Sequence, residues 1–140
     1  PNAMMPAQAD SVDLALAFRN VHSWMRMNQV ELFFSSIYDA LKPGGVLGVV
    51  QHRGIPGTSV EDMKKSAYVT EQQVIEFAEL AGFELDAKSE INANPRDTKD
   101  YEGGVWTLPP VLREGEKNRE QYIAIGESDR MTLRFVKPAS

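Results

Sequence analysis

The first hydrophobic pattern in the chain is a nearly continuous apolar run over residues 12–18, interrupted only by Asp13. A run of this kind is typical of a strand buried on both faces, as in a parallel sheet that helices cover on both sides. We therefore expect Leu14 and Leu16 to pack in the core. The pattern predicts an α/β fold.

A helix is predicted over residues 27–41, because the apolar residues there recur at intervals of three and four positions. Asn28, followed three positions later by Glu31, has the chemistry of a capping box at a helix start. The sequence of residues 42–45, Lys-Pro-Gly-Gly, ends the helix, since proline cannot continue it and glycine adopts the turn that follows. The apolar stripe consists of Val30, Phe33, Phe34, Ile37 and Leu41.

A second short apolar strand is predicted over residues 46–50. Strand, helix and strand in this order fit a right-handed crossover between two parallel strands. Both strands then end on the same side of the sheet, which is where ligands bind in open α/β sheets. Residues 19–24 and 51–54 are therefore expected to be neighbours that border a ligand pocket.

The second half of the chain is predicted to begin with a helix and a strand. Thr70, with Gln73 three positions later, has the pattern of an N-cap, and Gly82 has that of a C-terminal stop. A helix is therefore expected over residues 71–81. A strand is expected over residues 83–91, where apolar and polar residues alternate.

Clean alternation over residues 131–137 predicts a final strand, at an edge or antiparallel, that is covered on one face only. The segment 54–68 contains glycine, proline and polar residues and is expected to be a mobile loop. The segment 92–122 is long, polar and irregular, which is typical of a functional or disordered region. Within it, residues 113–122 are expected to form a short helix or a turn.

The composition is that of one ordinary globular domain. Of 140 residues, 42% are hydrophobic and 25% are charged. A net charge of −5 and the lack of a basic run argue against a nucleic-acid partner. Because the chain has no cysteine, disulfides, thiolate zinc sites and a cysteine nucleophile are excluded.

No apolar run approaches the roughly 18 residues needed to cross a bilayer. No signal peptide is visible, and we expect a cytoplasmic protein without a membrane partner. Residues 1–11 are expected to be a tail, and residues 1–4 resemble a remnant of an expression vector, so the natural N-terminus is expected elsewhere. Residues 12–138 are expected to form one partial α/β domain.

The order of these elements resembles the carboxyl-terminal half of a class I S-adenosylmethionine-dependent methyltransferase. In that family the fourth strand is followed by N and H, which match Asn20 and His22. Val12–Leu16 matches the fourth strand, and Leu41–Gly45 matches the LKPGG motif that ends the next helix. Gly82–Phe83 matches the entry into the sixth strand, and Met131–Val136 matches the antiparallel seventh strand.

Three further motifs are similar to a group of predicted bacterial methyltransferases: Phe18–His22, Gly104–Pro110 and Ser128–Pro138. The resemblance covers about residues 12–138 and implies strands four to seven of a doubly wound sheet, with flanking helices. The family's glycine-rich cofactor loop and the acidic residue that binds ribose cannot be placed, because no strand precedes residue 12. The resemblance therefore implies that a parent protein uses S-adenosylmethionine as its cofactor and that this chain alone binds it weakly or not at all.

Methyl transfer requires positioning of donor and acceptor and sometimes removal of a proton. His22 is the candidate catalytic base, because histidine titrates near neutral pH, and the alternative is a structural histidine. His52 and Arg53, at the end of the second strand, are candidate substrate-binding residues. Trp24 and Trp106 are candidates for an apolar lid over the substrate, with core packing as the alternative, which is favoured for Trp24.

Phe18, Arg19 and Asn20 are the candidate cofactor-binding residues, because they lie at the carboxyl end of the first strand. Arg19 and Asn20 could orient the cofactor or the substrate, and Asn20 could equally cap the turn. No metal site is expected. The acidic residues of the long irregular segment are expected to be a solvated run without a nearby histidine; these are Asp97, Asp100 and Glu102.

Three functional hypotheses remain open. The first is methyl transfer to a small-molecule acceptor by a parent protein, with this chain inactive alone. The second is a non-catalytic fragment or assembly module, whose first strand is an exposed edge that pairs two copies into a homodimer. The third, another doubly wound enzyme such as a dehydrogenase or hydrolase, ranks last because neither a Gly-x-Ser-x-Gly elbow nor a dinucleotide fingerprint occurs.

Overall fold

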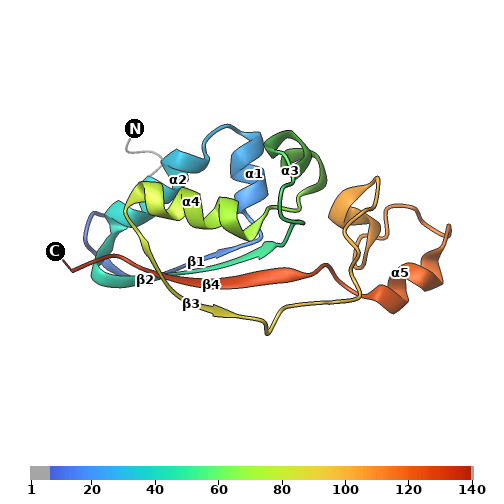
Figure 1. Cartoon of the computed structure of the whole chain (residues 1–140). Helices are drawn as coiled ribbons and strands as arrows, with labels where there is room; N and C mark the ends of the chain where they lie inside the picture. Colours follow the sequence, from blue (N-terminus) through green and yellow to red (C-terminus); the bar gives the residue numbers. More distant parts are fainter. Residues whose placement is uncertain (1–6, 140) are drawn as a thin grey trace.

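A four-stranded sheet organises residues 7–139, the part of the chain that this computed structural model describes. β1 and β2 are parallel, whereas β4 runs antiparallel to both β2 and β3. The α/β class and the antiparallel final strand are therefore confirmed (Figure 1). In sheet order the strands are β1 (Val12–Phe18), β2 (Leu41–His52), β4 (Arg130–Val136) and β3 (Glu84–Ser89).

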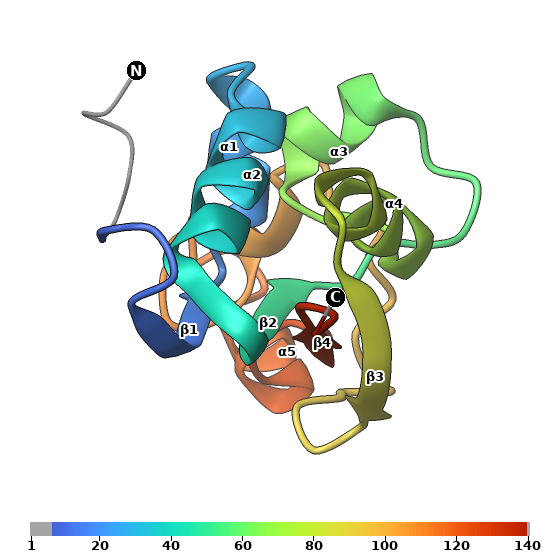
Figure 2. The ribbon, with the colours of Figure 1, turned by 90° about the vertical axis from the view of Figure 1, so that its left-hand side faces the viewer.

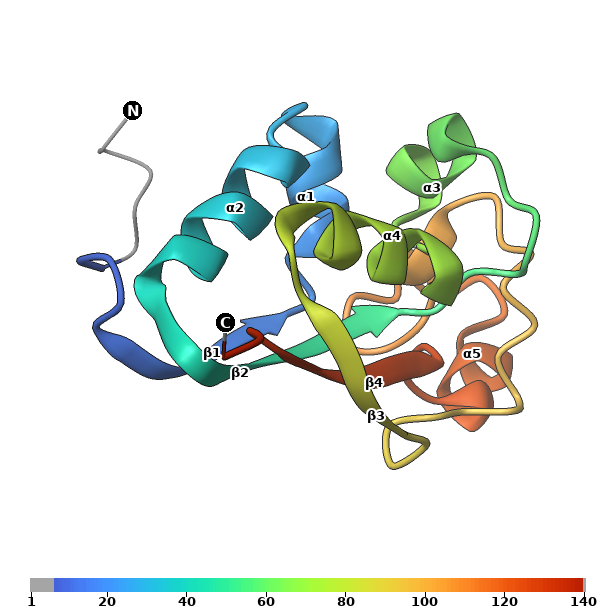
Figure 3. The same ribbon diagram turned by 60° about the vertical axis from the view of Figure 1, so that its left-hand side comes forward.

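Four helices lie on the same side of the sheet (Figures 1 and 2). They are α1 (Val21–Arg26), α2 (Val30–Ala40), α3 (Val60–Ser66) and α4 (Glu71–Ala81). α2 and α4 lie side by side over the strands (Figure 3). Beyond the carboxyl end of β2 lie η2 (Gly104–Thr107) and α5 (Arg119–Ile125). Within the described residues, no helix has the length and apolar character required to cross a membrane.

β1 is buried on one face only, which corrects the expectation of a strand covered on both sides. Leu14, Leu16 and Phe18 are 56%, 58% and 52% exposed, whereas Ala17 belongs to the core. β1 is an edge strand of the described sheet. Figure 1 shows α1 to α4 on one side of the sheet and α5 beyond the end of the strands, so no labelled helix lies over the other face of β1. We call this uncovered side of the sheet the open face. Residues 7–139 thus bury only part of the apolar run, and the side chains on its other face stay exposed.

The helix expected over residues 27–41 is shorter than predicted, because residues 27–29 form the turn between α1 and α2. Asn28 is not an N-cap. It adopts a left-handed φ of +56°, and its side-chain oxygen accepts a hydrogen bond from Lys64 Nζ at 3.2 Å. A left-handed residue interrupts a right-handed helix, and asparagine tolerates that conformation. The second strand is longer than the predicted 46–50, since it begins directly after α2.

The predicted α4 is confirmed together with its ends. Thr70 Oγ1 accepts a hydrogen bond from the backbone N–H of Gln73 at 3.1 Å, as an N-cap does. Gly82 adopts a φ of +112°, and a Cβ atom at this position would lie 2.9 Å from the ring of Tyr38. Glycine is therefore required here both by the backbone and by packing.

Other expectations need smaller corrections. The segment 54–68 is not wholly a loop, since it contains α3, capped by a hydrogen bond from Asp62 N–H to Ser59 Oγ at 3.2 Å. β4 is not an edge strand, because it pairs with β2 and β3. Of the expected tail, residues 1–6 lie outside the described part, whereas Asp10 and Ser11 donate backbone hydrogen bonds to the end of α2.

The hydrophobic core fills the space between the sheet and the helices. Leu47 and Val49 of β2 have no exposed surface, and their neighbours on β4 are almost fully buried. Helix residues close this core from above; they include Val21, Met25, Phe34, Val74 and Ala78.

Candidate functional site

The residues that follow β1 and β2 meet at one end of the sheet, as predicted. The backbone N–H of Arg19 donates to the carbonyl of Val50 at 2.6 Å, which ties the chain beyond β1 to the end of β2. Arg19 adopts a φ of +59°, so the chain turns sharply before α1. Arg19 and Asn20 are exposed, and the side chain of Asn20 makes no capping hydrogen bond.

His22, on α1, is anchored by the fully buried side chain of Gln51 on β2. The amide oxygen of Gln51 accepts from the backbone N–H of Val21 at 3.2 Å. Its amide nitrogen donates to the carbonyl of Ala67 and also lies 3.0 Å from Nδ1 of His22. One side-chain amide therefore joins α1, β2 and the end of α3.

His52, the last residue of β2, lies beside His22. Their ring centroids are 5.5 Å apart, and each residue is 8% exposed. Nδ1 of His52 is hydrogen-bonded to the hydroxyl of Ser128, just before β4. Trp106 of η2 lies edge-on to His22, with 6.2 Å between ring centroids. We refer to His22, His52 and Trp106 as the histidine cluster.

Two arginines hold Trp106 from different segments. The guanidinium carbons of Arg26 and Arg113 lie 4.7 and 5.1 Å from the centre of its ring system. A guanidinium over an aromatic face is attracted by the ring quadrupole. Arg26 also donates hydrogen bonds to backbone carbonyls of α3, so α1, α3 and η2 are linked at this point.

Burial keeps both histidines neutral near pH 7. Burial lowers the pKa of His22, and the nearby cations Arg26 and Arg19 lower it further. A hydrogen bond to Gln51 would raise this pKa if the amide oxygen faced the ring, but that oxygen accepts from the backbone N–H of Val21. Burial also lowers the pKa of His52 to about 3, with His22 and Arg130 adding to the effect. A neutral imidazole has one donor and one acceptor nitrogen, so each ring can offer either function to a ligand.

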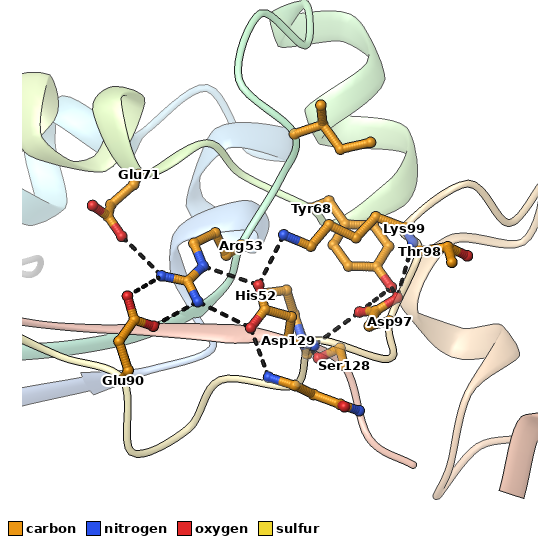
Figure 4. A network of polar contacts seen from close by, with 12 residues as sticks. His52, Arg53, Tyr68, Glu71, Glu90, Asp97, Thr98, Lys99, Ser128 and Asp129 are labelled. Carbon is orange, nitrogen blue, oxygen red and sulfur yellow. Dashed lines mark hydrogen bonds and ion pairs between the residues drawn. The ribbon is translucent and has the colours of Figure 1, made fainter. Parts of the chain in front are cut away.

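Arg53 follows His52 and is held by three carboxylates (Figure 4). Its Nε and Nη2 donate to Asp129 at 2.9 and 3.0 Å, and its two terminal nitrogens donate to Glu90 at 3.1 and 2.7 Å. Nη1 also donates to Glu71 at 3.2 Å. All five N–H donors of the guanidinium are thus engaged within the protein. Arg53 joins β2 to β4, α4 and the end of β3.

Asp129 is the buried centre of this network. Burial alone would raise the pKa of Asp129, but hydrogen bonds from Arg53 and Lys99 outweigh it and lower the pKa to about 2. Lys99 Nζ lies 2.8 Å from the carboxylate, and the backbone N–H of Asn94 donates to it at 2.7 Å. The long irregular segment is therefore fastened to β4 by a carboxylate that stays charged.

Asp97 is buried, which corrects the expectation of a solvated acidic run. It is 5% exposed, and the hydroxyl of Tyr68 donates to its carboxylate at 2.8 and 2.9 Å. The backbone N–H groups of Lys99 and Asp129 also donate to it, at 2.9 and 2.8 Å. Burial and the neighbouring Asp97 raise the pKa of Tyr68, so the phenol remains a donor. The other two acidic residues of the run are exposed.

A cavity of about 760 Å³ opens beside Arg53, between the loop after β2 and the first turn of α4. Its lining includes Lys99 and Asp129, but neither histidine. Among residues 7–139, no group of three histidine, aspartate or glutamate side chains is placed to hold a metal ion.

The structure brings some predicted site residues together and separates others. Trp24 is 7% exposed and stacks on Phe33 in the core, with ring centroids 4.7 Å apart. Phe18 lies on the open face. Gln51 and Ser128, which anchor the two histidines, were not singled out as site residues. Gln51 lies in the segment 51–54 that is expected to border the pocket, and Ser128 begins the motif Ser128–Pro138, but nothing in the sequence pairs either residue with a histidine.

Comparisons with known proteins place this arrangement among solved folds. No protein-family model and no curated protein matches the chain. The [4+2]-cyclase SpnF is similar in structure, with a TM-score of 0.64 and 19% identity over 100% of this chain and 56% of that one. A SAM-dependent methyltransferase from Methanosarcina mazei has a TM-score of 0.61 and 12% identity over 100% of this chain and 66% of that one.

A third similar structure is phosphoethanolamine N-methyltransferase 2 of Haemonchus contortus in complex with S-adenosyl-L-methionine. Its TM-score is 0.52, with 21% identity over 94% of this chain and 34% of that one. The chain therefore spans between about one third and two thirds of the length of these structures. The identities are low, so the likeness concerns the fold. The sheet order is β1-β2-β4-β3, with β4 antiparallel to its two neighbours, and helices cover one face. The chain therefore has a class I methyltransferase-like fold.

Proposed function

We propose that this chain is the carboxyl-terminal part of an S-adenosylmethionine-dependent methyltransferase that acts on a small-molecule acceptor. The observation that supports this function is the histidine cluster, which lies at the carboxyl ends of β1 and β2. Ligands bind at this position in open α/β sheets. In this assignment β1, β2, β3 and β4 correspond to the fourth, fifth, sixth and seventh strands of the complete sheet.

The cofactor would supply a methyl group on a sulfonium, which passes to the acceptor by in-line displacement. Phe18, Arg19 and Asn20 are the proposed cofactor contacts, since they end β1 and begin the turn after it. These residues do not enclose a cofactor, because all three are exposed and their turn contains no glycine. We therefore expect weak or no S-adenosylmethionine binding by this chain alone.

His22 is proposed to contact the acceptor, with His52 and Trp106 beside it. Positioning of the acceptor is the main task of such a site, and the three rings are held by contacts from α1, β2 and η2. Trp24 and Arg53 were also candidates for substrate contact. Because their contacts lie within the protein, they are proposed to support the site by fixing α1 and the end of β2.

Calorimetric titration of the 140-residue chain with S-adenosylmethionine tests the cofactor assignment. Binding should be absent or much weaker than micromolar, whereas a micromolar dissociation constant would show that the chain needs no further cofactor loop. Sequencing upstream of residue 5 gives the matching test. A glycine-rich strand–turn–helix there should restore micromolar binding in the longer protein, and His22→Gln should then lower kcat without abolishing that binding.

A second candidate function, an assembly module that forms a homodimer, is favoured by the open face. Leu14, Leu16 and Phe18 line a groove of about 560 Å³ on this face, beside the unpaired edge of β1. An exposed edge next to apolar surface is a template for pairing with another chain. Two copies that pair through β1 would satisfy its free backbone groups.

Size-exclusion chromatography with light scattering tests this second function. The wild-type chain should elute as a dimer, and Leu16→Lys, which places a charge on the open face, should shift it to the monomer while circular dichroism stays unchanged. A wild-type chain that is strictly monomeric at high concentration would sink the homodimer.

A further inference from the structure

The side-chain amide of Gln51 has an orientation that its backbone contacts determine. Its oxygen accepts from the N–H of Val21 at 3.2 Å, and its nitrogen donates to the carbonyl of Ala67 at 3.0 Å. A backbone N–H can only donate and a backbone carbonyl can only accept, so the reversed amide would lose both hydrogen bonds. In a side chain with no exposed surface, that loss leaves buried polar groups unpaired, which is costly. The amide orientation is therefore fixed without reference to His22.

The remaining hydrogen of this amide nitrogen meets Nδ1 of His22 at 3.0 Å. An amide NH₂ group has two donors and no acceptor, so Nδ1 must accept. The proton of the neutral ring then resides on Nε2. We propose that Gln51 is a positioning residue that locks His22 in its Nε2–H tautomer.

The lock also opposes a second proton on the ring. Protonation at Nδ1 would set an imidazole N–H against the NH₂ of Gln51 and leave a buried donor without an acceptor. Gln51 cannot turn its oxygen toward His22, because Val21 and Ala67 hold the amide. His22 is thus a poor base at either nitrogen.

The locked proton lies at the accessible side of the ring. Nε2 of His22 makes no hydrogen bond within residues 7–139, and it is not among the buried polar atoms that lack a partner there. Nε2 is therefore not fully buried, and we infer that its N–H can reach a ligand. Resting on the proposed function, His22 acts as a hydrogen-bond donor to an oxygen of the acceptor and is not its general base.

His52 provides an internal contrast. Its Nδ1 is paired with the hydroxyl of Ser128, and a hydroxyl can either donate or accept. Ser128 therefore anchors the ring of His52 without fixing its tautomer. Only His22 has its tautomer fixed, because its Nδ1 faces the amide nitrogen of Gln51, whereas Nδ1 of His52 faces the hydroxyl of Ser128.

Nitrogen-15 NMR of the 140-residue chain tests the lock, since the chain has 2 histidines and His52→Gln assigns them. Long-range proton–nitrogen spectra should show His22 with a protonated Nε2 and a pyridine-like Nδ1 across about pH 6 to 8. Gln51→Glu puts a carboxylate beside Nδ1, which should move the proton to Nδ1 and raise the His22 pKa by about 1–3 units. The control Ser128→Ala should change only the signals of His52.

The proposal is wrong if the wild-type spectrum shows the proton of His22 on Nδ1, or a mixture of tautomers. It is also wrong if a folded Gln51→Glu variant leaves the His22 signals unchanged. If that variant does not fold, as judged from its backbone amide spectrum, the wild-type tautomer decides alone. Neither cofactor nor acceptor is needed, so a failed lock is distinguishable from a failed S-adenosylmethionine titration. The expected result is one Nε2–H tautomer in the wild-type chain and its loss in Gln51→Glu.

Discussion

The two faces of the sheet carry similar aliphatic residues but differ in cover. On the helix-covered face Leu47 and Val49 are fully buried, whereas Leu14 and Leu16 on the open face are more than half exposed. Side chains alternate between the faces of a strand, so both sets come from equally apolar strands. Burial in this sheet is therefore decided by the helices that cover one face and not by the strands themselves. All-parallel sheets bury both faces, whereas a sheet with antiparallel pairs can leave one face to water, as this one does.

The open face is closed at one end. By alternation along β2, His52 belongs with Val46, Gly48 and Val50, which are partly exposed, yet His52 is 8% exposed. Ser128, just before β4, is hydrogen-bonded to its ring, and the ring of His22 lies beside it. The candidate site thus lies at the one end of the open face where side chains are buried. This explains how the polar histidine cluster can be buried there.

The largest effect should separate two identical substitutions. Leu47→Ala, on the covered face, should lower the free energy of unfolding by about 2–5 kcal/mol, because it leaves a cavity in the core. Leu16→Ala removes the same atoms from a side chain that is 58% exposed and should cost less than about 1 kcal/mol. Urea unfolding at low protein concentration measures both. Equal losses would break the comparison, since they would mean that the open face is buried in solution.

The next effect concerns acid stability. His52 titrates near pH 6.5 when unfolded and at about 3 when folded, so between these values only the unfolded chain takes up its proton. Its contribution is fully present above pH 6.5 and is lost as the pH falls, with a slope of up to about 1.4 kcal/mol per pH unit. His52→Gln should remove this slope from urea midpoints measured across that window. An equally steep acid loss in the variant would show that the imidazole of His52 is not held neutral.

A smaller loss of stability should follow from weakening α4, one of the helices that cover the sheet. Thr70→Ala removes the hydroxyl that caps α4 and should lower the free energy of unfolding by about 1 kcal/mol. Thr70→Ser retains a capping hydroxyl and is the matched control, so it should stay close to wild type in thermal or urea unfolding. A loss in Thr70→Ser as large as that in Thr70→Ala would assign the effect to packing of the methyl group.

Local chemistry explains which elements could be predicted from the sequence. The ends of α4 follow from Thr70 and Gly82, whose capping and turn conformations involve residues a few positions away. The parallel pairing of β1 with β2 follows from the strand–helix–strand order. The exposure of Leu14 could not be predicted, because it depends on cover from elsewhere and not on its own apolar strand.

The candidate site was predictable only in outline for the same reason. Strand ends located the two histidines, but their anchors are distant in the sequence: Gln51 lies 29 positions from His22, and Ser128 lies 76 positions from His52. A glutamine after a strand and a serine before one are common, so neither residue type points to a site. Arg53 was expected to contact substrate, and its carboxylate partners come from three separate segments that the pattern does not connect.

The smallest effect should come from a charged pair in which both partners are largely exposed. Arg134 Nε lies 2.7 Å from Asp86 Oδ2, with side chains 58% and 47% exposed, and Arg134 lines the groove of the open face. Water screens such a pair, so Arg134→Ala should cost less than about 1 kcal/mol, and less still at high salt. A double-mutant cycle with Asp86→Ala isolates the coupling between them. Coupling well above 1 kcal/mol that persists in salt would mean that the pair is shielded from water, as it would be if a second chain lay on the open face.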